Sequence, residues 1–362
     1  MNTSLTRREL LAGAGALALS PGILRIRPRE KPVGWAILGI GSYARNQIMP
    51  SFAACKHAKL VGLISGTPSK LETFGEQYGI PKSHRYDYEG MDAIRDNPEI
   101  EVVYVITPPA THPEFSIRAA KAGKHVCCEK PMAPTAAECR KMIDACKAAG
   151  KLMQIGYRSH YEAHNRRAIE ICRSGELGKI KSFRSDHGFN IGRGQWRTQK
   201  ALAGGGSMMD IGIYSLQALR YLSGEEPVEV SATITNPPND DRFVDCEDDV
   251  QFTLKLPSGT QCSGGSGYSW RPGKSRFEVV GEKGTLLGEP ATPYGGHRLY
   301  LDGEPLEVAP NNQFAAQIDQ FSECIRSGGK VLTPGEEGMR DIQIIEAIYA
   351  SAASGKPVRV PA

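Results

Sequence analysis

The sequence predicts an α/β protein: a doubly wound parallel sheet followed by an α+β domain whose sheet is large, open and mostly antiparallel. In the first half, continuous apolar runs alternate with helical segments, as expected for strands buried on both faces of a parallel sheet. From about Tyr157 onward, strand-like stretches follow one another with Gly and Pro turns, which is typical of antiparallel pairing. We therefore expect domains at residues 33–156 and 157–362.

Each element is expected from its own apolar pattern. Strands of the first domain are expected where apolar runs are continuous, at residues 33–40, 60–64, 102–106 and 125–128. Helices are expected between and after them, at residues 44–55 (bent at Pro50), 69–78, 113–122 and 135–149. Strands of the second domain are expected at residues 180–186, 228–235, 250–256, 261–267 and 276–280. Helices at residues 313–326 and 336–354 close the chain, and whether they return to the first domain is left open.

The composition is that of an ordinary globular protein, with 40% hydrophobic and 23% charged residues among 362. The net charge is only +4, from 44 Lys and Arg against 40 Asp and Glu. The sequence contains no basic run interleaved with aromatic residues. These features argue against nucleic acid and against a membrane surface as partners.

Residues 1–32 are predicted to be an export leader and a short arm. Arg7 and Arg8 precede an apolar run over residues 10–19, which is shorter than the roughly 20 residues that span a bilayer core. Paired arginines before a short apolar segment are typical of a twin-arginine signal and indicate a periplasmic protein. The alternative is a disordered tail on a cytoplasmic protein.

The cysteines do not suggest a metal site. Nine of them are spread along the chain without a C-x-x-C pair. Cys127 and Cys128 lie in an apolar run, where buried thiols are common. We expect mostly free, buried thiols and no metal.

The first strand leads directly into a G-x-G-x-x-A pattern that opens the first helix. Glycines at this turn let a pyrophosphate approach the backbone, and the free N–H groups of the helix N-terminus bind it. The pattern indicates a Rossmann dinucleotide-binding domain, although a tight turn without a ligand has the same local signature. The residues expected at the cofactor are Gly39, Gly41, Ser42, Tyr43 and Ala44.

The end of the second strand favours NADP over NAD. NAD-binding domains usually place Asp or Glu there to hold the ribose 2′-hydroxyl, whereas this strand ends in Ser65. Ser65 can donate a hydrogen bond to a 2′-phosphate, and Lys70 on the following helix could supply the positive charge. Lys70 could equally be a solvated helix residue.

Two later loops also follow buried strands. In doubly wound sheets ligands lie outside the carboxyl ends of the strands, so Thr107 and Pro108 should line the nicotinamide end of the cleft. His112 in the same segment either contacts the ribose or caps the next helix. Lys130, between Glu129 and a proline, is placed to donate a proton or hydrogen bond to a substrate oxygen, with a plain surface lysine as the alternative.

A glycine-rich segment, residues 204–206, leads into a helix that continues to about Leu222. Asp210 and Tyr214 are four residues apart and should share one face of this helix. Three glycines would let the helix approach another backbone or a ligand closely. Neither residue needs a function to account for its position. A carboxylate near the start of a helix interacts favourably with the helix dipole, and a tyrosine on a helix can simply pack against its neighbours.

The order of these motifs resembles the Gfo/Idh/MocA oxidoreductases, and within them the glucose–fructose oxidoreductase type. The likeness extends over about residues 33–360, with specific stretches at residues 127–132, 156–158, 195–197, 310–314 and 334–339. Most relatives carry histidine where this chain has Tyr214, whereas the glucose–fructose type carries tyrosine. The resemblance implies Lys130, Asp210 and Tyr214 as catalytic residues. Further cofactor contacts are expected from Glu129, Lys130, Arg158, Trp196 and Arg197.

The resemblance also implies an activity. An aldose would be oxidised at C1 to a lactone, with Tyr214 removing the hydroxyl proton, and tightly bound NADP would pass the hydride to fructose or another aldose, giving an alditol. One alternative is a conventional NADP-dependent aldose 1-dehydrogenase with an exchangeable cofactor, and another is a non-catalytic nucleotide-binding sensor. A homo-oligomer, dimer or tetramer, is expected. The arm is shorter than in that type, although Arg25, Arg27 and Arg29 could reach an adenine.

Overall fold

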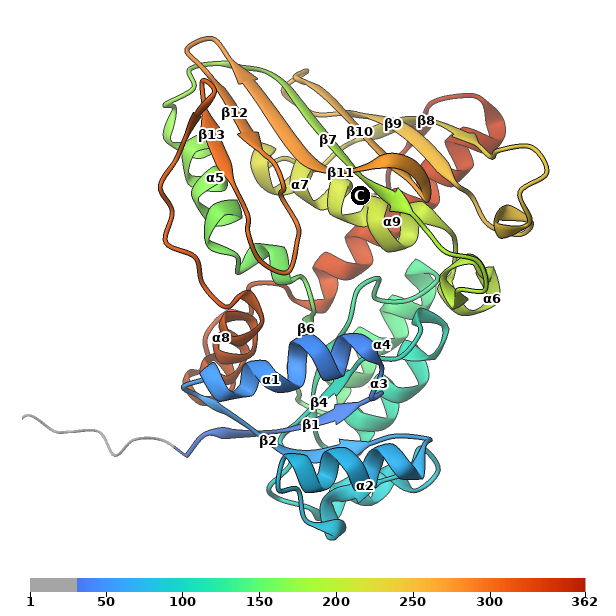
Figure 1. Ribbon diagram of the computed structural model, residues 1–362, viewed down its shortest axis with the longest axis vertical. Coiled ribbons are helices and arrows are strands. Elements are labelled where there is room, and N and C mark those ends of the chain that lie inside the picture. The colour runs from blue at the N-terminus through green and yellow to red at the C-terminus, as the bar shows by residue number, and fades with distance from the viewer. Residues whose placement is uncertain (1–30, 362) are drawn as a thin grey trace, which may run out of the picture. The chain divides into compact units, whose positions relative to one another are not determined.

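The computed structural model describes residues 31–361. The predicted leader, its paired arginines and the arm arginines lie outside these residues. Residues Pro32–Ala362 form one unit that contains both sheets, drawn in Figure 1.

The first sheet has six parallel strands in the order β3-β2-β1-β4-β5-β6. This confirms the predicted doubly wound sheet. The chain order reverses between β1 and β4, so the carboxyl ends of these two strands border a crevice where ligands bind in such sheets. The strands are β1 (Val33–Leu38), β2 (Ala58–Ile64), β3 (Arg85–Tyr86), β4 (Val102–Val105), β5 (His125–Cys128) and β6 (Met153–Ile155).

The helices around this sheet agree with the predicted segments: α2 (Pro68–Gln77), α3 (His112–Lys121) and α4 (Ala136–Ala148). The predicted bend at Pro50 is present, because the first helix is divided into a π-helical turn (Ala44–Ile48), α1 (Met49–Ser51) and a 3₁₀ turn (Phe52–Ala54). Helix α4 has Thr135 as its N-cap: Thr135 Oγ1 accepts from Glu138 N at 3.2 Å and donates to the Glu138 carboxylate at 2.9 Å.

The second sheet has nine strands in the order β14-β13-β12-β11-β7-β10-β9-β8-β15. Strands β7 and β10 pair in parallel and the other neighbours are antiparallel, which confirms the mostly antiparallel prediction. The strands are β7 (Ile180–Asn190), β8 (Glu229–Thr235), β9 (Asp249–Lys255), β10 (Gln261–Gly267), β11 (Ser269–Gly281), β12 (Thr285–Gly288), β13 (Leu299–Leu301), β14 (Glu304–Pro305) and β15 (Val358–Arg359).

Helices α5 (Ala163–Ser174), α7 (Ile213–Ser223) and α9 (Gly335–Ser354) pack on the second sheet (Figure 1). A short α6 (Lys200–Ala203) precedes α7. Helix α8 (Gln313–Ser327) returns to the first sheet, where Phe321 packs edge-on against Trp35 and Ser322 Oγ accepts from the Trp35 indole at 3.0 Å. Helix α8, the first of the two closing helices, therefore stabilises the sheet of the first domain.

All nine cysteines lie in the described part of the chain, and all nine are free. Seven of them are buried and two are partly exposed, which agrees with the prediction of mostly free, buried thiols. Within residues 31–361 no group of His, Cys, Asp and Glu side chains has a metal-binding arrangement. No helix of this part is long and apolar enough to cross a bilayer.

A buried ion pair joins α7 to α9. Arg220 Nη1 donates to Asp341 Oδ1 at 2.6 Å, and both side chains are almost completely buried. Arg220→Met would leave the Asp341 carboxylate buried without its cation. We expect a loss of about 3–5 kcal/mol of unfolding free energy in urea titrations. Lys147→Ala, which removes an exposed pair with Glu336, should cost less than about 1 kcal/mol, and equal losses in both variants would contradict the argument.

Candidate active site

A cavity of about 600 Å³ opens at the carboxyl ends of β1, β4 and β5 and extends to the second sheet. Most of the residues predicted for cofactor or substrate meet on its wall, although they come from distant parts of the sequence. Those lining it are Gly41, Ser42, Tyr43, Thr107, Pro108, Glu129, Lys130, Arg158, Trp196, Arg197, Asp210 and Tyr214.

The turn after β1 has the geometry that its glycines suggested. Gly39 has φ +95°, and a Cβ there would lie 2.5 Å from the Ile106 carbonyl oxygen, so only glycine fits. Gly41 has open space on its cavity side, where a phosphate could approach the backbone. Ala44 does not reach the cavity and is buried between the first helix and the sheet. The turn fits a dinucleotide, with Gly39 and Ala44 in structural roles.

Ser65 and Lys70 lie one strand away from the cavity. Ser65 directly follows β2, and its Oγ accepts from Thr67 N at 3.2 Å. Lys70 is in the first turn of α2. Neither residue lines the cavity, but β2 is the neighbour of β1, so both border the region into which an extended dinucleotide would continue.

His112 does not lie on the cavity, which corrects its expected cofactor contact. Its ring is fully buried, with Nδ1 3.0 Å from the Pro131 carbonyl oxygen and Nε2 2.7 Å from that of Thr107. Burial lowers the pKa of His112. The neutral ring lies between the Thr107 loop and the turn after Lys130 and can donate to one of the two carbonyls.

Lys130 follows β5 and points toward the helix of the glycine-rich segment. Its Nζ donates to the Asp210 carbonyl oxygen at 2.5 Å and to Asp210 Oδ1 at 3.2 Å. The same ammonium lies 4.6 Å from the centroid of the Tyr214 ring. Although burial opposes the charge, the neighbouring Tyr214, Asp210 and Glu129 raise the pKa of Lys130. Lys130 is therefore a protonated donor.

Glu129 stabilises the turn that carries Lys130. Its Oε1 accepts from the Tyr104 hydroxyl at 2.5 Å, and its Oε2 accepts from the Lys130 backbone N–H at 3.2 Å. Burial raises the pKa of Glu129.

Asp210 is held by three donors. Besides Lys130, Arg197 Nε lies 3.2 Å from Oδ2, and the Tyr268 hydroxyl donates to Oδ2 at 2.9 Å. Burial alone would raise the pKa of this carboxyl, but the charges of Lys130 and Arg197 hold it below its usual value. Asp210 is therefore an ionised acceptor at the cavity wall.

Asp210 and Tyr214 both face the cavity, as their spacing predicted. Asp210 lies in a π-helical turn (Met208–Gly212) that continues into α7 at Ile213. Gly206 precedes this turn, and only glycine fits there because a Cβ would lie 2.0 Å from the Glu247 carbonyl oxygen. This close approach accounts for a glycine in the segment. The Glu247 carboxylate accepts from the backbone N–H of Gly206 at 2.7 Å and of Met208 at 2.9 Å.

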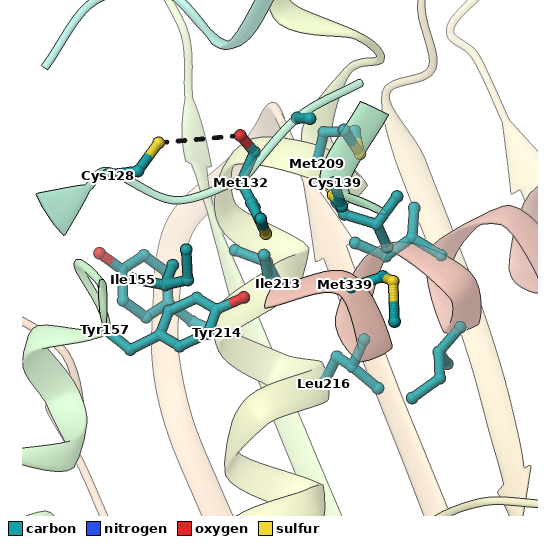
Figure 2. Close-up of a cluster of buried hydrophobic side chains, with 14 of the residues drawn as sticks. Cys128, Met132, Cys139, Ile155, Tyr157, Met209, Ile213, Tyr214, Leu216 and Met339 are labelled. Carbon is teal, nitrogen blue, oxygen red and sulfur yellow. Dashed lines mark hydrogen bonds between the residues drawn. The ribbon is translucent and has the colours of Figure 1, made fainter. Parts of the chain in front are cut away.

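The Tyr214 ring belongs to the buried cluster drawn in Figure 2, together with Met132, Ile155 and Ile213. Only 8% of the residue is exposed, so its ring is fixed while it still lines the cavity. This combination lets the phenol meet a ligand with little freedom to move.

The sequence analysis missed three residues that contribute to the site: Tyr268, Glu247 and Tyr294. Tyr268 and Glu247 support Asp210 and its helix, and Tyr294 lines the cavity from the segment between β12 and β13. A Pro and two Gly residues around Tyr294 indicate a turn but not its target. No local signal marks the other two.

Both domains match the models of a known protein family. The model of the oxidoreductase family Gfo/Idh/MocA, NAD-binding Rossmann fold, matches residues 33–157, and its C-terminal domain model matches residues 165–287. The chain is 51% identical to aldose-aldose oxidoreductase from Caulobacter crescentus, whose structure superposes with a TM-score of 0.89 over 91% of this chain and 100% of that one.

Two further proteins are more distant. D-xylose 1-dehydrogenase (NADP(+)) of Haloarcula marismortui is 27% identical, covering 91% of this chain and 94% of the relative. A levoglucosan dehydrogenase structure in complex with NADH and levoglucosan is 23% identical with a TM-score of 0.77, covering 92% of this chain and 100% of that one, and shares the fold.

Proposed function

Because the chain belongs to the Gfo/Idh/MocA family of oxidoreductases, we propose that it is a sugar oxidoreductase that works on two sugars in turn. It oxidises an aldose at C1 to the lactone and reduces a second sugar, fructose or another aldose, to an alditol, with tightly bound NADP(H) as the carrier between them. The observation that carries this proposal is the Lys130–Asp210–Tyr214 group on the wall of the cavity that opens at the β1 turn.

The residues have separate roles in this reaction. When bound, the nicotinamide ring supplies the hydride acceptor for the first sugar and the hydride donor for the second. Tyr214 takes the proton of the C1 hydroxyl on its phenolic oxygen and returns a proton to the second sugar. The Lys130 ammonium, 4.6 Å from the centroid of the Tyr214 ring, stabilises negative charge on that oxygen. Asp210 keeps Lys130 in place and can accept a hydrogen bond from a sugar hydroxyl.

Absorbance of the extensively dialysed protein, with no cofactor supplied, tests the two-sugar cycle. We expect a reduced-nicotinamide band to appear near 340 nm when glucose is added and to disappear when fructose or a second aldose follows. The control is the same protein with the second sugar alone. A band that forms only after NADP is added, and then grows through many turnovers, would instead support a conventional dehydrogenase, which the xylose dehydrogenase relatives make the second candidate.

NADP, rather than NAD, is proposed because Ser65, and not a carboxylate, directly follows β2. Ser65→Asp keeps an acceptor for the Thr67 N–H and adds a negative charge beside the proposed 2′-phosphate. We expect NADP binding to weaken at least about tenfold, which is about 1.4 kcal/mol, while NAD binding is maintained or improves. Binding of both nucleotides is measured by fluorescence titration of the stripped protein. Equal weakening of both would contradict the assignment.

Export through the twin-arginine route and assembly into a homo-oligomer are proposed as well. The first rests on Arg7, Arg8 and the apolar run after them, and the second on the resemblance to family members. NADP is scarce outside the cytoplasm, so a cofactor that is loaded before export and stays bound would suit an exported enzyme of this kind.

A further inference from the structure

Arg158 occupies an unusual position for a residue expected to bind a cofactor. It follows β6 in the chain and is only 4% exposed. Its guanidinium carbon lies 5.0 Å from the centroid of the Tyr214 ring and 4.9 Å from that of Tyr294. The charge is therefore placed against the ring that we assign to proton transfer.

The hydrogen bonds of Arg158 all go to neutral acceptors. Nη1 donates to the Pro293 carbonyl at 3.0 Å and to Gln313 Oε1 at 2.8 Å, and Nη2 donates to the Thr292 carbonyl at 2.7 Å. Within residues 31–361 no carboxylate forms an ion pair with Arg158, and its Nε has no hydrogen-bond partner. A buried cation is costly unless an anion balances it, so this charge is available to a negative charge that forms nearby.

The other charged or titratable groups around the Tyr214 ring are already occupied or neutral. Asp210 is balanced by Lys130 and Arg197, and Glu129 accepts from Tyr104. His187 on β7 has its ring centroid 6.1 Å from that of Tyr214, and burial, together with the charge of Arg158, lowers the pKa of His187 to about 3. The remaining neighbours are the phenols of Tyr43 and Tyr294.

Arg158 itself remains charged. Burial opposes its charge, but the adjacent Tyr214, Tyr43 and Tyr294 raise the pKa of Arg158 above its usual value. Lys130 and Arg158 are thus two permanent cations within 5.0 Å of the same ring centroid, and only Lys130 has a carboxylate partner.

We propose that Arg158 is a positioning residue that stabilises the phenolate form of Tyr214 during proton transfer. The proton moves between the sugar hydroxyl and the Tyr214 oxygen, and Arg158 neither gives nor takes one. Its effect is electrostatic, because a cation within about 4–6 Å favours the charged form of its neighbour. This inference rests on the role of Tyr214 in the proposed function.

The test compares Arg158→Gln, which removes the charge, with Arg158→Lys, which keeps it. The phenolate of Tyr214 is followed by NMR of protein labelled at the tyrosine ζ carbon, without any sugar, and is assigned with Tyr214→Phe. In Arg158→Gln we expect the phenolate signal to appear at a pH higher by about one unit or more. In Arg158→Lys most of that displacement should be absent, because the charge remains although the bonds to the carbonyls change.

A second variant keeps Arg158 in place. Gln313→Glu puts a carboxylate on the atom that now accepts from Nη1, and so neutralises the arginine without removing it. It should displace the phenolate signal to higher pH in the same direction as Arg158→Gln, and it serves as the test if Arg158→Gln does not fold. Arg158→Gln and Gln313→Glu are also assayed for the pH dependence of sugar oxidation, and we expect that dependence to move to higher pH as well.

An unchanged phenolate signal in the folded charge-removing variants would overturn the proposal. Equal displacements in Arg158→Gln and Arg158→Lys would also overturn it, because they would indicate a purely structural role for Arg158. The NMR measurement needs no turnover. A displaced signal in a protein that oxidises no sugar would therefore support the effect of Arg158 while rejecting the proposed function, so the two failures are distinguishable.

Discussion

Replacing Tyr214 by phenylalanine is expected to lower the rate of sugar oxidation roughly 10²–10⁴-fold, the usual contribution of a group that transfers a proton in the transition state. The ring packs in a buried cluster with Met132, Ile155 and Ile213, and phenylalanine keeps that packing. Only the phenolic oxygen is removed. We therefore expect the fold and the affinity for the nucleotide to stay near those of the parent protein.

The measurement is the rate at which the reduced-nicotinamide band forms with saturating aldose, followed by stopped flow in the presence of NADP. Tyr300→Phe is the matched control, because Tyr300 lies on β13 and does not line the cavity. A rate for Tyr214→Phe within about tenfold of the parent would remove Tyr214 from proton transfer.

Lys130→Met is expected to lower turnover roughly 10²–10³-fold, the loss seen when a single charge-stabilising donor is removed from an active site. Methionine fills a similar volume, so the packing beside the Tyr214 ring is kept. Asp210 keeps Arg197 and Tyr268 as partners, and its carboxylate is not left unpaired. The loss should therefore appear in activity and only weakly in stability.

Steady-state kinetics with urea unfolding separates these effects. For Lys130→Met we expect kcat to fall far more than KM for the aldose rises, because the ammonium acts mainly on charge that develops in the transition state. Lys121→Met, at the exposed end of α3, is the control for loss of a lysine charge. A change confined to KM would mean that Lys130 only binds the ground-state sugar.

The elements that the sequence predicted well are those with a strong internal pattern. Four strands of the first sheet stand out as continuous apolar runs; all six residues of β1 are buried. Strands β3 and β6 were missed because they have only two and three residues. Helix α5 was missed because only Ala168 and Ile171 of its twelve residues are buried, which leaves little apolar periodicity. Strands β12 to β15 have between two and four residues, and their pairing partners rather than their own pattern make them strands.

The sequence by itself predicted the Rossmann turn and the absence of a carboxylate after β2, because each lies in a local motif. It predicted Lys130, Asp210 and Tyr214 as catalytic residues only through the resemblance of its motifs to those of the family. The tertiary structure decided that Lys130 reaches Asp210 across 80 positions of sequence, that His112 is buried away from the cavity, and that Arg158 lies against Tyr214. Local patterns encode which face of an element is buried and where it turns. Which side chains meet between two sheets depends on how the elements pack, and no single segment contains that information.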